Sequence, residues 1–303
     1  MIHDVVIIGG GPAGLAAAIY AGRAKLKGFV LEKMSPGGQV LVTDMVENYP
    51  GFMEPISGFE LVEKFTAHAK RFGMPIETGE VERIEPIGDQ FNLILTDERT
   101  ITARSVIVAT GATHRKLGVK GEQELTGRGV SYCATCDGPF FRDQVVAVVG
   151  GGDSAVQEAI FLTKFAKKVY VIHRRDELRA IKILQERAFA NDKIDFVWDS
   201  IVEEIEGKDQ VQAVKILNKK SGKQSRLEVD GVFIFIGIQP ITDFVKGLVD
   251  TDERGFIKTD QWMRTSFKGI YAAGDCRQKP LLQIVTAVAE GATAAYAVEH
   301  DLA

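Results

Sequence analysis

The chain has 303 residues, with 37 Lys and Arg against 41 Asp and Glu, and its formal net charge is −4 at pH 7. This balance disfavours nucleic acid and anionic membrane surfaces as partners, and 45% hydrophobic residues exclude a disordered chain. An average domain has about 150 residues, so two domains are expected. No run approaches the roughly 18 apolar residues of a membrane span, and no secretory signal opens the chain. We therefore expect a cytoplasmic protein.

A strand, a glycine-rich turn and a helix open the sequence. The β-branched run Val5–Ile8 leads into a G-x-G-x-x-G pattern at Gly9, Gly11 and Gly14, and an alanine-rich helical segment follows at 15–24. In such a turn the first glycine reverses the chain, the second lets a pyrophosphate approach the backbone, and the third lets helix and strand pack closely. The pattern predicts a dinucleotide-binding site.

The same pattern recurs 141 residues later. The strand Val145–Val149 leads into Gly150 and Gly152, with Asp153 and Ser154 opening a helical stretch. Two copies predict an α/β fold with two Rossmann-like dinucleotide-binding domains.

The copies differ where the second strand ends. The first copy ends that strand at Glu32, whose carboxylate can accept hydrogen bonds from ribose hydroxyls. The second copy has His173, Arg174 and Arg175 there, followed by Arg179. A carboxylate repels a 2′-phosphate, whereas guanidinium groups pair with it. The difference predicts FAD in the first site and NADPH in the second.

Two apolar runs, 106–111 and 232–237, are expected to form buried strands that end in glycine. The segment 216–227 is expected to contain a solvated hairpin turn.

The C-terminal segment carries a further apolar strand that ends in Gly274 and Asp275. Ligands of open α/β sheets lie at the carboxyl ends of the strands, so Asp275 is expected to bind a ribityl hydroxyl of the flavin. The second domain is then an insertion. We predict an FAD domain at 1–111 and 241–303 and an NADPH domain at 112–240. The chain crosses between them at 111–116 and at 237–240, and these two short segments, which contain glycine or proline, are expected to act as a hinge.

Cys133 and Cys136 form a C-x-x-C motif, followed directly by Asp137. Such a pair forms either a reversible disulfide or half of a zinc site, and zinc needs a second ligand cluster, which the scattered histidines do not supply. We therefore favour a redox dithiol and expect no metal. Asp137 is a candidate proton relay, with a local turn residue as the alternative. Cys276 is interpreted as a buried apolar residue.

Taken together, these motifs resemble the low-molecular-weight, NADPH-dependent bacterial-type thioredoxin reductases over the whole chain. The similarity rests on the two glycine turns, the sequence CATCDG at 133–138, the arginine group, the loop 36–39, the segment 46–51 and Gly274-Asp275 with Gln283. The resemblance implies the following dinucleotide contacts: Gly9, Gly11, Pro12, Ala13, Gly14, Glu32, Lys33, Gly38, Gln39, Asn48, Val81, Ala109, Thr110, Gly111, Asp275, Gln283 and Ile284 for FAD; Gly150, Gly152, Asp153, Ser154, His173, Arg174, Arg175, Arg179, Ile236 and Gly237 for NADPH.

The resemblance also implies a homodimer in which electrons pass from NADPH to FAD, then to the Cys133–Cys136 disulfide and on to thioredoxin or a thioredoxin-like protein. The inserted domain is expected to rotate between the two half-reactions. Leu282 departs from the pattern, because many members have arginine before the glutamine. Two alternatives stay open: a disulfide reductase serving a glutaredoxin-like or peroxidase-linked carrier, and a nucleotide-sensing scaffold without activity.

Overall fold

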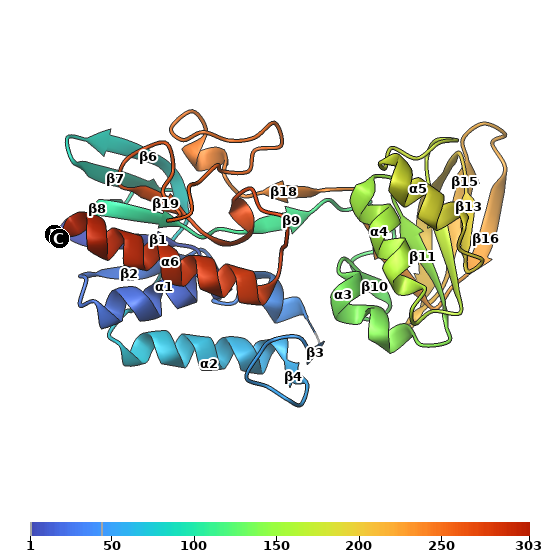
Figure 1. Ribbon diagram of the computed structural model, residues 1–303, viewed down its shortest axis with the longest axis horizontal. Coiled ribbons are helices and arrows are strands. Elements are labelled where there is room, and N and C mark those ends of the chain that lie inside the picture. Colours follow the sequence, from blue (N-terminus) through green and yellow to red (C-terminus); the bar gives the residue numbers. More distant parts are fainter. Residues whose placement is uncertain (1, 44) are drawn as a thin grey trace. The chain divides into compact units, whose positions relative to one another are not determined.

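The computed structural model describes residues 2–43 and 45–303, and the chain forms two compact units (Figure 1). Unit 1 comprises Met1–Thr113 and Gln239–Ala303, and unit 2 comprises His114–Ile238. Unit 2 is therefore an insertion, two residues shorter at each end than the range 112–240. At the two crossings, β9 (Ala112–His114) and β18 (Ile238–Pro240) pair as a two-stranded sheet.

Unit 1 is built on a mixed sheet whose order is β5-β2-β1-β8-β7-β6, with β19 paired to β8. The strands β5, β2, β1, β8 and β19 run parallel, and β7 and β6 continue the sheet antiparallel. β19 belongs to the C-terminal segment, so the chain returns to complete the sheet that it began. The bounds are β1 Ile2–Ile8, β2 Gly28–Glu32, β5 Ile76–Thr78, β6 Val81–Ile87, β7 Gln90–Leu95, β8 Thr100–Val108 and β19 Ile270–Ala272.

Three helices of unit 1, α1 (Pro12–Arg23), α2 (Gly58–Arg71) and α6 (Ile284–Leu302), lie on one side of this sheet (Figure 1). α1 and α6 pack so closely that a Cβ on Gly291 would lie 2.0 Å from the carbonyl oxygen of Ala13. Alternate residues of β1 face opposite sides of the sheet, and both sides are buried in apolar clusters. Short elements complete the unit: η1 Gly38–Val42, β3 Met45–Val46, β4 Ile56–Ser57, η3 Asp243–Val245 and η4 Gly274–Cys276.

Unit 2 has a five-stranded parallel sheet with the order β10-β17-β11-β12-β13. One face packs against helices, and the other packs against the antiparallel sheet β14-β15-β16, whose last two strands form the hairpin expected near residues 216–227. The bounds are β10 Val130–Ser131, α3 Ala134–Asp137, η2 Gly138–Phe141, β11 Val145–Val149, α4 Asp153–Leu162, β12 Lys168–Ile172, α5 Lys182–Phe189, β13 Ile194–Val197, β14 Ser200–Gly207, β15 Val211–Asn218, β16 Gln224–Glu228 and β17 Gly231–Ile234.

Two apolar runs end as strands earlier than the sequence suggests. β8 stops at Val108 rather than continuing to Gly111, and β17 stops at Ile234 rather than continuing to Gly237. Both glycines have positive φ, 71° and 123°, which turns the backbone out of the extended conformation. Within the described residues, no helix is long and apolar enough to cross a membrane.

Candidate active site

Cys133 and Cys136 form a disulfide at the start of the short helix α3. Cys133 is the N-cap residue of this helix, and the backbone N–H of Cys136 donates to its Sγ at 3.2 Å. The pair follows β10, which belongs to the parallel sheet of unit 2. The redox pair is thus fixed on the same compact unit as the second glycine turn. The described part of the chain contains no group of three or more His, Cys, Asp or Glu residues that could hold a metal ion.

Asp137, at the end of α3, is linked to the disulfide residues through Ser131. The hydroxyl of Ser131 donates to Oδ2 of Asp137 at 2.6 Å, and the backbone N–H of Cys133 donates to the Ser131 oxygen at 3.1 Å. Ser131 is buried, with 5% of its surface exposed. The serine therefore joins the carboxylate to the backbone of the redox pair, a contact that the sequence analysis missed because it had no reason to single out Ser131.

The first glycine turn has the geometry that a bound pyrophosphate requires. A Cβ on Gly9 would lie 2.4 Å from the carbonyl oxygen of Ala109, and one on Gly14 would lie 1.8 Å from that of Gly9. A Cβ on Gly11 would meet nothing within 4 Å. Gly9 and Gly14 are therefore required by close packing, whereas Gly11 leaves open space beside the N-terminus of α1, where a phosphate is favoured.

Glu32 ends β2 beside this turn. Its Oε2 accepts a hydrogen bond from the backbone N–H of Gly10 at 2.7 Å, and its Oε1 accepts one from that of Met34 at 3.1 Å. The carboxylate is half-buried, and each oxygen keeps lone-pair capacity for a ribose hydroxyl.

The second glycine turn repeats the backbone but changes the charge. A Cβ on Gly150 would lie 2.5 Å from the carbonyl oxygen of Phe235, whereas one on Gly152 would have only the Arg179 guanidinium, at 3.9 Å, within 4 Å. The backbone N–H of Arg179 donates to the carbonyl of Gly151 at 2.7 Å. Arg179 thus lies over the open glycine of this turn.

His173 follows β12 and is almost fully buried, with 4% of its surface exposed. Burial lowers its pKa, and the charges of Arg179, Arg174 and Arg175 lower it further. Its Nε2 has no hydrogen-bond partner within the described residues. A neutral imidazole and three guanidinium groups therefore gather at the end of β12.

Comparisons with known proteins place this arrangement in a family. Residues 3–291 match the family described as pyridine nucleotide-disulphide oxidoreductase. The chain belongs to this family.

Its relatives include the thioredoxin reductase of Listeria innocua, which is 50% identical over 97% of this chain and 92% of its own length. The thioredoxin reductase of Bacillus subtilis is 49% identical over 99% of this chain and 94% of its own length. A thioredoxin reductase structure from Streptococcus pyogenes has 54% identity and a TM-score of 0.94, over 99% of this chain and 98% of that one. One from Lactococcus lactis has 48% identity and a TM-score of 0.69, over 99% of each chain.

Membership of the pyridine nucleotide-disulphide oxidoreductases confirms that the protein is an enzyme and confirms the predicted fold class. FAD and NADPH are the cofactors of the thioredoxin reductases in this family, as the two glycine turns predicted. The residues present fit both groups. Gly11 and Gly152 leave open space at the N-termini of α1 and α4. Glu32 ends β2 in the first copy, and the arginines follow β12 in the second.

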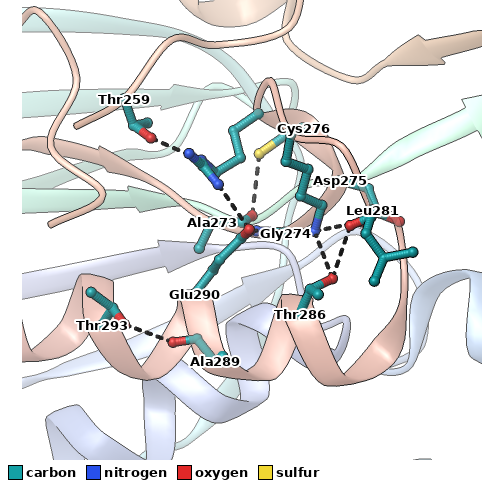
Figure 2. A network of polar contacts seen from close by, with 12 residues as sticks. Thr259, Ala273, Gly274, Asp275, Cys276, Leu281, Thr286, Ala289, Glu290 and Thr293 are labelled. Carbon is teal, nitrogen blue, oxygen red and sulfur yellow. Dashed lines mark hydrogen bonds and ion pairs between the residues drawn. The ribbon is translucent and has the colours of Figure 1, made fainter. Parts of the chain in front are cut away.

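Asp275 follows the C-terminal end of β19 and belongs to a network of polar side chains (Figure 2). Its Oδ1 is buried and, in the part of the chain that the structure describes, has no directed hydrogen bond; the Lys279 ammonium lies 2.9 Å away as an ion pair. Glu290 of α6 receives the backbone N–H of Gly274 at 2.8 Å and the guanidinium of Arg277 at 2.8 Å. Because Oδ1 faces the Lys279 ammonium and the side chain is 34% exposed, the carboxylate keeps lone-pair capacity for a ribityl hydroxyl.

Several of the other predicted contacts are tied to one another. The side-chain amide of Asn48 donates to Oε1 of Gln283 at 3.0 Å, and Gln283 caps α6, which begins at Ile284. The side-chain amide of Gln39 donates to the carbonyl of Ala112 at 3.3 Å, and the hydroxyl of Thr110 donates to the carbonyl of Ile241 at 2.6 Å. These residues thus fix loops within unit 1.

Five further residues predicted to contact a nucleotide lie in different elements of the two units. Oδ1 of Asp153 accepts from the backbone N–H of Ile181 at 2.7 Å, Ser154 is exposed in the first turn of α4, and Ile236 packs against the core of unit 2. Lys33 is exposed and lies 3.7 Å from Glu80, and Val81 is buried at the start of β6.

Two buried ionisable side chains, Cys276 and Glu122, have structural roles. Cys276 is fully buried, its thiol donates to the carbonyls of Val108 and Ala273, both at 3.3 Å, and burial raises its pKa to about 11. Glu122 is buried and accepts hydrogen bonds from the backbone N–H groups of Leu117 and Gly118 and from the hydroxyl of Tyr132. Glu122 thus ties the residue before Cys133 to the chain that follows the first crossing.

Proposed function

We propose that the protein is an NADPH-dependent thioredoxin-disulfide reductase. The observation that carries the proposal is the Cys133–Cys136 disulfide, held with Asp137 on the unit whose glycine turn carries arginines. The thioredoxin reductases of Listeria innocua and Bacillus subtilis support thioredoxin as the substrate, since they share about half of their residues with this chain over nearly its whole length.

The two units are assigned different nucleotides. The FAD domain is 1–111 with 241–303, supported by the open turn at Gly11 and by the carboxylates of Glu32 and Asp275. The NADPH domain is 112–240, supported by the group His173, Arg174, Arg175 and Arg179, because guanidinium groups form charge-assisted hydrogen bonds with a 2′-phosphate.

FAD, when bound, supplies a two-electron relay between NADPH and the disulfide. The dithiol of Cys133 and Cys136 then reduces thioredoxin by exchange: one thiolate attacks the substrate disulfide, a mixed disulfide forms, and the second thiol resolves it. This restores the Cys133–Cys136 bond and leaves thioredoxin with two thiols. Asp137 holds the proton that a departing thiolate takes up, and the Ser131 hydroxyl fixes the position of its carboxylate.

Turnover requires unit 2 to rotate against unit 1. The NADPH site and the disulfide belong to the same unit, and each must come within near-contact distance of the flavin ring. They cannot occupy one face together, and the reduced cysteines must also meet a bulky protein. The crossings at β9 and β18 are the hinge. A quantitative cross-link between the units should block thioredoxin reduction; an unchanged rate would exclude rotation.

The partners follow from the family. The enzyme is proposed to be a cytoplasmic homodimer that binds neither nucleic acid nor membranes, and sedimentation at working concentrations tests the dimer. One kinetic experiment separates the candidate functions: NADPH oxidation is followed with thioredoxin, with a glutaredoxin-like protein and with a peroxidase-linked carrier. Turnover only with one of the last two would reassign the acceptor. No turnover with any disulfide, in protein loaded with FAD, would favour a nucleotide-sensing scaffold.

A further inference from the structure

The loop that carries Asp275 is held to α6 by a network of four charged side chains, three of which are nearly buried (Figure 2). The side chain of Lys279 is 3% exposed, and those of Glu290 and Arg277 are 13% and 14% exposed. Removing an ammonium from water is costly unless it is paired. Lys279 is paired twice, since its Nζ lies 2.9 Å from Oδ1 of Asp275 and 3.3 Å from Oε2 of Glu290.

The two cations of this network are not equivalent. Arg277 donates to Oε1 of Glu290 at 2.8 Å and to the hydroxyl of Thr259 at 2.8 Å. Glu290 therefore already has a buried cation at close range, as well as the backbone N–H of Gly274. Of these two cations, only Lys279 contacts Asp275 within the described residues, and it also donates to the hydroxyl of Thr286 at 3.4 Å.

We propose that Lys279 is a positioning residue that holds the Asp275 carboxylate for FAD, an inference that rests on the proposed assignment of Asp275 to the flavin. Glu290 fixes the backbone immediately before Asp275 through Gly274, and the Lys279 ammonium fixes the side chain. The side chain of Asp275 is 34% exposed, so it remains accessible to a ligand hydroxyl. Without the ammonium, the carboxylate loses the one cation that contacts it within the described residues and is free to rotate away from the ligand.

FAD affinity of the apoprotein tests the proposal. Lys279→Met should raise the dissociation constant of FAD about tenfold, the loss expected for one charge-assisted contact. The matched control is Arg277→Gln, which removes the other buried cation on Glu290 but does not touch Asp275 and should change the constant less than about twofold. Thermal unfolding of both apoproteins reports the structural cost of each change separately. Equal weakening of FAD binding by the two variants would overturn the proposal.

A double-variant cycle shows whether Lys279 acts through Asp275. Once Asp275→Asn has removed the carboxylate, adding Lys279→Met should weaken FAD binding no further; additive losses would overturn the inference. If Asp275→Asn weakens FAD binding but Lys279→Met does not, only this inference is wrong. If Asp275→Asn itself has no effect, the proposed flavin role of Asp275 is wrong as well. Should Lys279→Met not fold, Lys279→Gln, which removes the charge but keeps a polar side chain, replaces it in the same comparison.

Discussion

The two glycine turns of this chain share a backbone conformation and differ in the charge at the end of the strand that follows. Gly9 and Gly150 both have positive φ and approach a neighbouring carbonyl too closely for any side chain. The following strands then end differently. Glu32 is held by two backbone N–H groups in unit 1, whereas unit 2 has a buried His173 among arginines, with no hydrogen-bond partner for its Nε2 within the described residues. On the proposed assignment, the turn accepts a pyrophosphate in either unit, and the residues at the end of the next strand select between the two nucleotides.

The units also differ in redox chemistry, because the disulfide belongs to unit 2 alone. Cys133→Ser or Cys136→Ser should abolish thioredoxin reduction while NADPH still reduces the flavin, since the dithiol lies after the flavin in the electron path. Stopped-flow absorbance of the flavin and a thioredoxin assay measure the two half-reactions. The control is Cys276→Ala, whose buried thiol has no part in transfer. Residual thioredoxin reduction in the Cys133→Ser/Cys136→Ser double variant would remove the cysteines from the path.

Asp137 gives the next largest effect. Asp137→Asn keeps the shape of the side chain but cannot hold the transferable proton, so turnover with thioredoxin should fall about 10²-fold or more without being abolished. Flavin reduction by NADPH should be unaffected. Asp143→Asn, an exposed change in the same unit, is the control. An unchanged rate in Asp137→Asn would make the aspartate a turn residue.

The arginines test nucleotide selection directly. Arg174→Ala with Arg175→Ala should raise KM for NADPH about a hundredfold while changing KM for NADH little, because each lost charge-assisted pair costs about 1.5 to 3 kcal/mol. Steady-state kinetics with both nucleotides give the ratio. Arg187→Ala removes an exposed charge from α5 and should leave that ratio unchanged. Equal losses for both nucleotides would show that the arginines do not contact the 2′-phosphate.

The corresponding change in unit 1 is Glu32→Gln. The amide keeps one acceptor oxygen but replaces the other with a donor, so a ribose hydroxyl loses its partner, and FAD affinity should fall about tenfold. Fluorescence titration of apoprotein with FAD measures this. Glu63→Gln, which removes an exposed carboxylate from α2 of the same unit, serves as control. Unchanged affinity in Glu32→Gln would mean that Glu32 only supports the turn through Gly10.

Short stretches of sequence were enough to predict the elements whose conformation depends on neighbouring residues. The glycine turns, their strands and helices, and the hairpin at β15 and β16 follow from periodicity and turn residues over short stretches. The C-x-x-C motif identified the disulfide in the same way. Strand ends were harder, because the apolar runs before Gly111 and Gly237 continue past Val108 and Ile234, the last residues of the two strands.

The contacts that join distant residues gave no sequence signal. Glu122 reads as a surface charge in a polar stretch, yet it is buried against Tyr132, ten residues away. Lys279 and Glu290 form part of a buried network only because the C-terminal helix packs against the loop after β19. Charged residues at such positions are recognised only when their partners are known, since an isolated Lys or Glu is almost always exposed.

The smallest predicted effect compares one ion pair from each unit. In unit 1, Arg264 binds both oxygens of Asp301 at 2.8 and 2.6 Å, and the buried hydroxyl of Tyr271 donates to Oδ2 at 2.7 Å. In unit 2, the side chain of Glu204 pairs with the ammonium groups of two exposed lysines, Lys120 and Lys215. Arg264 lowers the pKa of Asp301 to about 2, and Lys120 chiefly lowers that of Glu204 to about 2.

Because the folded pKa of Asp301 lies below the usual value of about 3.9, its stabilisation is present above about pH 4 and is lost as the pH falls towards 2. Asp301→Asn should therefore lower the free energy of unfolding at pH 7 by about 1 kcal/mol, a value reduced for partial exposure, and the difference from wild type should vanish near pH 2. Thermal unfolding across pH measures it. Glu204→Gln is the comparison: its smaller effect should disappear in 1 M salt, which screens mobile lysines more than a bidentate pair anchored by a buried tyrosine. Equal salt sensitivity in the two variants would show that the bidentate geometry and the tyrosine add nothing.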